Sequence, residues 1–343
     1  MAAGTVMINS HIGSPISMIT FSELFPFITQ ILFGAVFLFT SFVYWMLYFR
    51  ASPCVFQHRT DDEKHFMDEN GQQKPFPSLK DECTLDLSVI VPAYNEQDRI
   101  RPMLESCLHF LTDVSRKSTF EVIVVSDGSV DRTCDIVMEY VQQYGSNQIR
   151  LLKLQENRGK GGAVCLGMQS ARGRTLLFAD ADGATKFEDL DKLETVLHYL
   201  APNDITECAN NLHAVVCGSR AHLETESKAQ RSIFRTILMV CFHIHVWLFG
   251  VRTIKDTQCG FKLFTRPAAR ILFDNLHVNG WAFDVEMLYI AEKLKFKLTE
   301  IPVNWTEIEG SKIVPVWSWL EMGFDVLKIW FKYRIGSWEI ITE

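Results

Sequence analysis

Between residues 87 and 219 the chain repeats one pattern, a short run of apolar and β-branched residues followed by a segment with helical periodicity. The apolar runs are "LSVIVPAY", "FEVIVVSD", "IRLLKL", "TLLFAD" and "HAVVCGS". Strands that are apolar throughout and alternate with amphipathic helices predict βαβ units with a mainly parallel sheet, covered on both faces. Ligands bind beyond the carboxyl ends of such strands. The polar motifs "PAYNE", "SDGS" and "ADADGA" fall there.

Composition limits the class of protein. With 343 residues, 48% of them hydrophobic, the chain can bury the core of one large domain or of two ordinary ones. A formal net charge of -7 argues against a nucleic-acid binder, which normally has a basic face. Nine cysteines, an odd number without a CxxC pair, favour a reducing compartment over a disulfide framework or a zinc site.

An uncharged apolar run covers residues 24–49 and is long enough, as a helix, to cross a hydrocarbon core of roughly 30 Å. The alternative, a cleaved signal peptide, lacks its basic start and small-residue cleavage site. No Lys or Arg precedes the run, whereas Arg50, Arg59 and Lys64 follow it, so the positive-inside rule places the downstream chain in the cytosol. We expect a lumenal N-terminus over 1–23, a transmembrane signal-anchor over 24–49, and a polar linker or surface wrap over 50–86.

Two carboxylates, Asp180 and Asp182, end the apolar run "TLLFAD". At this spacing both can approach one hard divalent cation, and Mg²⁺ usually takes one or two carboxylates and completes its shell with water and substrate phosphates. An EF-hand loop is excluded because Gly183 comes two positions too early. A pair that caps the next helix is the alternative. The pattern favours a metal site that clamps a diphosphate.

The stretch "NRGKGGA" is a second candidate anion site. It is not a P-loop, because Gly161 stands where Ser or Thr should hold magnesium. A glycine-rich turn with Arg158 and Lys160 at a helix N-terminus can still bind an anion through free backbone N–H groups. A plain helix-start turn with solvated basic residues is the alternative reading.

Taken together and in order, "SVIVPAYNE", "VIVVSDGSVDRT", "NRGKGGA", "ADADGAT", "CGSRA" and "DTQCGFKLFTR" resemble the inverting nucleotide-sugar glycosyltransferases of family 2 over residues 87–305. The resemblance implies a Rossmann-like, A-type glycosyltransferase domain over 87–312. The N-terminal run, "GWAFDVEMLYIA" and "VNWTEIEGSKIVP" are similar to the members that transfer glucose from UDP-glucose to dolichyl phosphate. Those members serve lipid-linked oligosaccharide assembly and protein N-glycosylation at the endoplasmic reticulum.

The resemblance implies roles for individual residues. It implies that the first motif holds the nucleoside diphosphate through Pro92, Ala93, Tyr94 and Glu96. It implies that Asp127 hydrogen-bonds the uracil ring, with Ser126 in place of the acid that many members have before it. It also implies that Asp180 and Asp182 hold Mg²⁺ or Mn²⁺. The remaining expected contacts are basic: Arg158 and Lys160 for the donor, Arg220 for either substrate's phosphate, and Arg231, Arg235 and Lys312 for the acceptor phosphate.

Asp256 occupies the position where some family members carry a general base. A phosphomonoester acceptor is largely ionised at pH 7, since its second pKa lies near 6, and it needs no base. We therefore expect Asp256 to orient loops or substrate. In-line attack on α-linked UDP-glucose would give a β-linked product.

A lipid acceptor calls for apolar surface near the membrane. Residues 232–251 are strongly apolar but contain Arg235, His243 and His245, which favours an interfacial helix, with a buried core helix as the alternative. Residues 313–343 place Trp and Phe at helical spacing among basic residues, the pattern of a membrane-interface region.

Three other functions are alternatives to this one. A GDP-mannose donor keeps the lipid acceptor and differs only in the sugar nucleotide. A processive polysaccharide synthase should carry a Q-x-x-R-W motif and several spans, and this chain has neither. A membrane-anchored nucleotide-sugar binder without turnover would be distinguished by an activity assay.

Overall fold

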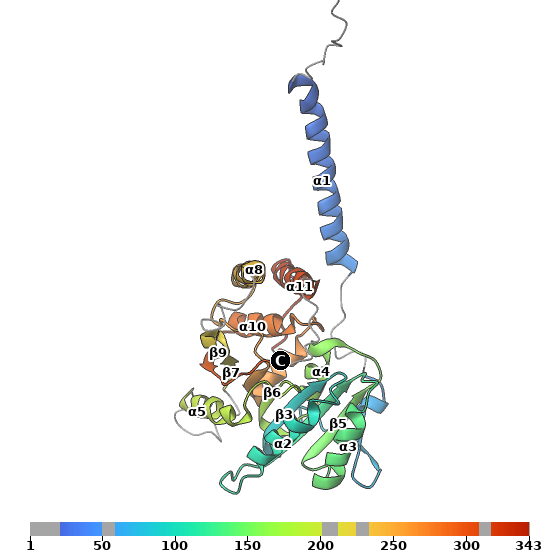
Figure 1. Cartoon of the computed structure of the whole chain (residues 1–343), viewed down its shortest axis with the longest axis vertical. Coiled ribbons are helices and arrows are strands. Elements are labelled where there is room, and N and C mark those ends of the chain that lie inside the picture. The colour runs from blue at the N-terminus through green and yellow to red at the C-terminus, as the bar shows by residue number, and fades with distance from the viewer. Residues whose placement is uncertain (1–20, 50–58, 201–211, 224–232, 309–316, 343) are drawn as a thin grey trace, which may run out of the picture. The chain divides into compact units, whose positions relative to one another are not determined.

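The structure is a computed structural model that describes residues 21–49, 59–200, 212–223, 233–308 and 317–342. It divides into two units, Met1–Ala51 and Ser52–Glu343, which are taken separately. In the first unit one helix, α1 (Phe21–Phe49), is 29 residues long, contains Pro26 and includes the predicted anchor (Figure 1). Within the described ranges, no helix meets both the length and the hydropathy that a membrane crossing requires.

The second unit is built on a seven-stranded sheet in the order β5-β4-β3-β6-β8-β7-β9. The sheet is mainly parallel, as predicted, and β8 alone runs antiparallel to its neighbours β6 and β7. The strands are β3 (Leu85–Ala93), β4 (Phe120–Asp127), β5 (Ile149–Leu154), β6 (Gly173–Ala179), β7 (Ala214–Ser219), β8 (Phe261–Thr265) and β9 (Lys297–Pro302).

Helices cover both faces of this sheet. One apolar core lies under α4, α9 and α10, and the other lies under α2, α3 and α5. On β3, Ile90 belongs to the first core while Val89 and Val91 belong to the second, so consecutive side chains from Leu87 to Val91 are buried on alternate faces. This two-sided burial explains the unbroken apolar runs, since each such side chain contributes about 1.5–3 kcal/mol when buried. The covering elements are α2 (Ile100–Leu111), α3 (Thr133–Tyr144), α4 (Gly159–Gln169), η3 (Phe187–Asp189), α5 (Leu190–Leu200), α9 (Arg266–Asp274) and α10 (Phe283–Lys293).

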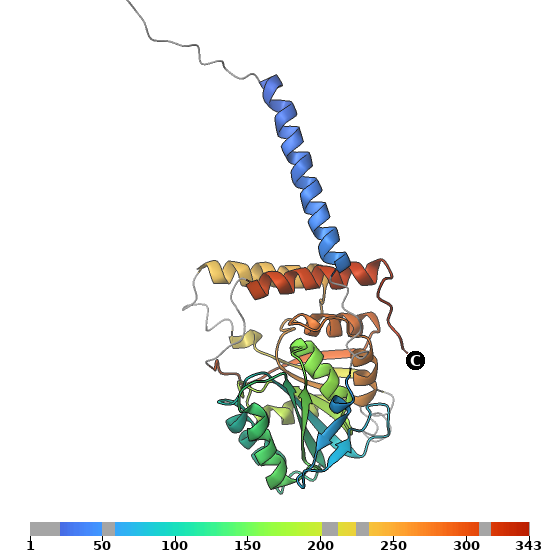
Figure 2. The ribbon, with the colours of Figure 1, turned by 90° about the vertical axis from the view of Figure 1, so that its right-hand side faces the viewer.

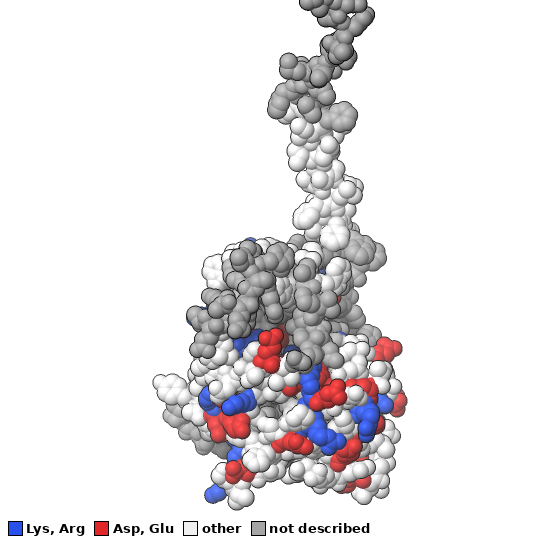
Figure 3. All heavy atoms as spheres, in the orientation of Figure 1, with Lys and Arg blue, Asp and Glu red and all other residues white. Residues whose placement is uncertain are grey.

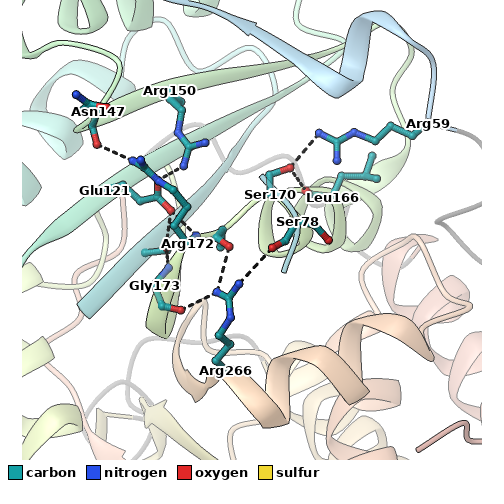
Figure 4. Close-up of polar contacts among 12 residues, drawn as sticks. Arg59, Ser78, Glu121, Asn147, Arg150, Leu166, Ser170, Arg172, Gly173 and Arg266 are labelled. Atoms are coloured by element: carbon teal, nitrogen blue, oxygen red, sulfur yellow. Dashed lines mark hydrogen bonds and ion pairs between the residues drawn. The ribbon is translucent and has the colours of Figure 1, made fainter. Parts of the chain in front are cut away.

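The polar segment before the sheet is folded onto the domain and is not a free linker. It contains η2 (Asp62–Lys64) and a hairpin of β1 (His65–Met67) with β2 (Gln73–Pro75), and β1 lies against β5. Arginines from distant parts of the chain hold it. Arg266 donates to the carbonyls of Ser78 and Asp81, and Arg59 donates to Ser170 Oγ (Figure 4). Of the two sequence-based alternatives, the described part of this segment is therefore the surface wrap.

A buried charge cluster supports the same wrap. Glu121, fully buried on β4, pairs with Arg150 and with Arg172 (Figure 4). The Arg150 guanidinium also lies over the rings of Phe66 and Phe76, at 5.3 and 5.4 Å from their centroids. Because these two phenylalanines belong to the N-terminal hairpin, the cluster joins the hairpin to the sheet.

Two further helices, α8 (Ile233–Phe249) and α11 (Trp317–Arg334), lie side by side in a layer beyond α10 (Figure 2). The ring of Phe249 meets that of Trp330 edge-on at 5.5 Å, and His245 Nε2 lies 2.8 Å from the carbonyl of Gly323. Trp247 and Leu248 are about half exposed, so the described part of α8 is not a core helix.

Candidate active site

Three neighbouring parallel strands end at one edge of the sheet. β3 lies between β4 and β6, and its last residue, Ala93, pairs with Ser126, one residue before the end of β4. Three residues earlier on β3, Ile90 pairs with Phe178, one residue before the end of β6. The "PAYNE" loop, Asp127 and Asp180 therefore gather at this edge, as the sequence pattern predicts.

Asp180 and Asp182 follow β6 directly, and Lys160 at the start of α4 faces them. The Lys160 ammonium lies 2.7 Å from Asp180 Oδ1, and Asp182 Oδ1 accepts the backbone N–H of Ala184 at 3.0 Å. Burial, followed by the charge of Asp180, raises the pKa of Asp182 above its ordinary value. Two like charges held together, one of them already attracting an ammonium, form a site suited to a cation.

A divalent cation fits this pair. In the part of the chain that the structure describes, no group of three or more His, Cys, Asp or Glu side chains is arranged to hold a metal ion. Asp180 and Asp182 would supply two carboxylate ligands, and water and phosphate oxygens would fill the remaining positions. That is the usual way in which Mg²⁺ is bound in phosphate-handling sites.

Gly260 makes room for the first carboxylate. The Asp180 N–H donates to the Gly260 carbonyl at 3.0 Å, and a Cβ placed on Gly260 would lie 1.9 Å from Asp180 Oδ2. No side chain larger than hydrogen fits there without moving the carboxylate. The sequence analysis missed this role because it becomes visible only when β8 is placed beside β6.

Asp127, the last residue of β4, is 3% exposed. Its Oδ1 accepts the backbone N–H of Arg158 at 2.7 Å, and its carbonyl accepts Asn157 Nδ2 at 3.0 Å. Burial raises the pKa of Asp127 to about 6, although the backbone N–H groups of Arg158 and Gly159 act in the opposite direction. At neutral pH the carboxylate is therefore ionised and can accept a hydrogen bond from a ring N–H.

The two basic residues of "NRGKGGA" have different surroundings. Lys160 lies beside Asp180 and over the rings of Phe178 and Trp281, at 5.2 and 5.5 Å. The Arg158 guanidinium instead donates to Glu63 Oε2 at 2.6 Å, in the N-terminal wrap. Lys160 therefore lies at the carboxylate pair and Arg158 does not, and a contact of either residue with substrate stays a prediction.

The "PAYNE" loop is held by its own hydrogen bonds. Asn95, with φ at 51°, accepts the Val130 N–H through Oδ1 at 2.9 Å. Glu96 is buried and grips Arg99 through two hydrogen bonds of 2.6 Å. Tyr94 is 41% exposed and remains accessible to a ligand. The other two predicted contacts, Pro92 and Ala93, are the last two residues of β3, and Ala93 is buried.

Arg99 is a charged residue of the site that the sequence analysis missed. Burial lowers the pKa of Arg99, but the bond to Glu96 and the charges of Asp182 and Asp180 outweigh it, so the pKa is raised. Arg99 thus adds a second cation, beside Lys160, near the two metal-binding candidates. The sequence clue was its position in "PAYNEQDRI", where Arg99 comes three residues after Glu96.

Arg220 and Asp256 form one unit. The guanidinium donates to both carboxylate oxygens at 2.8 Å, and the Arg220 backbone N–H adds a third bond of 2.8 Å. Burial alone would raise the pKa of Asp256, yet the hydrogen bond and charge of Arg220 outweigh it and lower the pKa. Arg220 also lies over the ring of Trp305, at 5.5 Å. A carboxylate so held is a weak proton acceptor.

A buried ion pair beneath the site was also missed. Lys262 on β8 is 2.6 Å from Asp284 on α10 and donates to the Cys259 carbonyl at 2.6 Å. Both side chains are buried. The lysine inside "FKLF" was the available signal.

The three residues predicted for the acceptor phosphate cannot be placed, since Arg231 and Lys312 lie outside the described residues and the side chain of Arg235 on α8 is not described.

Comparisons with known proteins agree with this architecture. The sequence model of glycosyl transferase family 2 matches residues 88–269. The chain is 54% identical to dolichyl-phosphate beta-glucosyltransferase of Drosophila melanogaster, over 87% of this chain and 90% of that protein. The proteins of the same name from Homo sapiens and Saccharomyces cerevisiae are 52% and 41% identical, over 82% and 79% of this chain and 86% and 83% of theirs. The chain belongs to the dolichyl-phosphate β-glucosyltransferases of glycosyltransferase family 2.

A weaker similarity, too low to inform the site, relates the chain to a solved structure of glucosyl-3-phosphoglycerate synthase from Mycobacterium tuberculosis. The TM-score is 0.47 and the identity 15%, over 74% of this chain and 81% of that one.

Proposed function

We propose that the protein transfers glucose from UDP-glucose to dolichyl phosphate with inversion and releases dolichyl β-D-glucosyl phosphate and UDP. The observation that carries the proposal is the 54% identity, over 87% of this chain and 90% of the relative, to a protein named dolichyl-phosphate beta-glucosyltransferase. The edge of the sheet where Asp127, Asp180 and Asp182 gather supports the same assignment. The names of the relatives do not favour the GDP-mannose alternative.

The donor would bind along this edge of the sheet. The ionised, buried Asp127 suits the N–H of a uracil ring, and Lys160 with Arg99 supplies positive charge for a diphosphate. Asp180 and Asp182 would hold a divalent cation, Mg²⁺ or Mn²⁺. When bound, such an ion neutralises charge that builds on a departing diphosphate.

The acceptor needs little help with proton transfer. At pH 7 a phosphomonoester is largely ionised, because its second pKa is near 6, so its oxygen can attack the anomeric carbon directly. The protein then has to align the attacking phosphate oxygen with the anomeric carbon. Holding two reactants in line in this way can remove a large part of the activation barrier. Asp256 fixes the direction of the Arg220 guanidinium, and Arg220 can then orient a phosphate. Attack from the face opposite UDP inverts the α-linkage to β.

The membrane assignments belong to the same proposal. We place the protein in the membrane of the endoplasmic reticulum as a single-pass protein, anchored by residues 24–49, with the catalytic unit facing the cytosol. Three features support this: the uncharged run in α1, the basic residues after it, and the exposed apolar side chains of α8 and α11. On α11 these include Trp317 and Leu320, which are 72% and 52% exposed.

A transfer assay tests the proposal. Purified full-length protein is incubated with labelled UDP-glucose, dolichyl phosphate and Mg²⁺, and the label is followed into the organic phase. We expect lipid-soluble label that requires the lipid phosphate and is suppressed by unlabelled UDP-glucose but not by GDP-mannose. In a parallel incubation, lipid-soluble label from labelled GDP-mannose and none from UDP-glucose would assign the mannose donor instead. Tight UDP binding without any turnover would identify a non-catalytic binder.

A further inference from the structure

A fully buried carboxylate from outside the family 2 match lies behind the nucleotide loop. Glu63 belongs to η2 in the N-terminal wrap, ahead of the matched residues 88–269. Its Oε2 accepts Arg158 Nη2 at 2.6 Å and its Oε1 accepts the Gln155 N–H at 3.1 Å. Both ends of the loop 155–158 are therefore attached to one carboxylate.

The loop held by Glu63 in turn holds Asp127. Its backbone N–H at Arg158 bonds Asp127 Oδ1 at 2.7 Å, and Asn157 Nδ2 bonds the Asp127 carbonyl at 3.0 Å. The two loops also pack without spare room, because a Cβ on Gly128 would lie 2.7 Å from the Asn157 nitrogen. A shift of the loop 155–158 must therefore move the Asp127 carboxylate.

Glu63 is itself fixed. Its Oε2 accepts the Thr60 N–H at 2.9 Å, and its carbonyl accepts Arg59 Nε at 2.7 Å. Arg59 in turn reaches Ser170 Oγ, 3.0 Å away (Figure 4). The partner Arg158 is mostly buried, and its Nη1 has no hydrogen-bond partner among the described residues. Removing the Glu63 charge would leave this guanidinium without its ion pair, which is costly in a buried setting.

We propose that Glu63 is a positioning residue of the donor site, which fixes the loop 155–158 and through it the orientation of Asp127. The N-terminal wrap thus supports the nucleotide-binding loops from behind. This inference rests on the proposed function, in which Asp127 receives the uracil of UDP.

The positioning role of Glu63 is tested in the full-length protein by calorimetric measurement of UDP binding and by steady-state kinetics for both substrates. Glu63→Gln should raise the Kd for UDP and the KM for UDP-glucose by roughly tenfold, the scale of one lost charged hydrogen bond. The KM for dolichyl phosphate and kcat should stay near wild type, a split that general loss of structure would not produce. Glu63→Asp keeps the charge but shortens the reach, so we expect a smaller rise.

Arg270→Gln is the matched control. Arg270 clamps the same wrap at the carbonyls of Leu79 and Asp81, at 2.7 and 2.8 Å, but touches neither the loop 155–158 nor Asp127 in the described structure. This variant should lower the melting temperature without changing the UDP Kd. The substitutions Glu63→Gln and Arg158→Gln each break the same contact. The double variant should therefore bind UDP about as weakly as whichever single variant binds it more weakly.

The outcomes separate the inference from the function on which it rests. If the Glu63 variants fold and bind UDP like wild type, or if they lower kcat and raise both KM values alike, the positioning role is wrong. Should Glu63→Gln fail to fold, Glu63→Asp decides by the same two criteria. Failure of the wild-type protein to bind UDP at all would instead overturn the proposed donor.

Discussion

At the scale of single residues, the described charges of the site are arranged in pairs before any substrate arrives. Lys160 meets Asp180, and Arg220 meets Asp256 through two bonds. Groups held in this way need little reorganisation when charge develops on a reacting phosphate, and such preorganisation is often the largest contribution to catalysis.

Replacing Asp180 or Asp182 with Ala should abolish transfer and leave the fold intact. Both follow the end of β6 and lie outside the apolar core, so their removal should not unfold the protein. Activity should fall by at least about 10²–10³-fold, the loss typical of one electrostatic catalytic group. Turnover and thermal melting of each variant are compared with Asp61→Ala, a control at an exposed surface ion pair. Near-normal turnover in either variant would rule out the carboxylate pair as the metal clamp.

UDP affinity should fall as the pH drops through about 6. The buried Asp127 has its pKa raised to about 6, and only the ionised form is a full acceptor for a ring N–H. Binding should therefore be strongest above pH 6 and weaken below it, while Asp127→Asn should bind more weakly with a flatter pH profile. Calorimetric titration with UDP on both sides of pH 6 checks this. A wild-type affinity that does not change with pH would contradict the role of Asp127.

Asp256→Asn should lower the rate by a similar factor across pH. The Arg220 contact outweighs burial and lowers the pKa of Asp256, so this carboxylate stays ionised throughout the working range and serves to hold the guanidinium. A general base, by contrast, would contribute about 10²–10⁴-fold, and its loss would remove an ionisation from the profile. Rates are measured from about pH 5.5 to 8.5, around the phosphate pKa near 6. Loss of a basic ionisation in the variant would show that a base is required.

At the scale of elements, β8 lies beside β6 and brings Gly260 against Asp180, although the sequence pattern did not predict this strand. β3, β4, β5, β6 and β7 were predicted because apolar residues fill both of their faces. The signal in β8 is interrupted by Lys262, whose charge is buried against Asp284 on a helix that follows later in the chain. β9 is partly exposed at the edge of the sheet and has only a weak pattern. Periodicity identifies strands buried by ordinary packing, and it fails where a buried ion pair replaces an apolar contact.

Gly260→Ala tests the contact between β8 and β6. Because a Cβ would overlap the Asp180 carboxylate, the transfer activity of the variant should fall by about 10²-fold or more, on the scale of a displaced catalytic group. Gly71→Ala, in an open turn of the N-terminal hairpin, is the control; its positive φ should cost stability but not activity. Full activity in folded Gly260→Ala would show that Asp180 can move without loss of function.

At the scale of the whole molecule, a sheet covered on both faces presents one functional edge. On the face shown in Figure 3, basic and acidic side chains are interspersed. The carboxylates of this edge could be located from the sequence because ligands bind beyond the carboxyl ends of parallel strands, and the polar motifs follow those ends. The sequence did not locate the supports behind them, such as Glu63 and Gly260, since these depend on contacts between segments far apart in the chain.

The most direct test of this account is the structure of the product. Wild-type protein is incubated with UDP-glucose and dolichyl phosphate, and the anomeric configuration of the purified lipid is determined by NMR while released UDP is quantified. One in-line displacement by a phosphate oxygen predicts a single β-linked glucosyl phosphodiester and one UDP for each lipid glucosylated. An α-linked product, or UDP release with free glucose and no glycolipid, would contradict it.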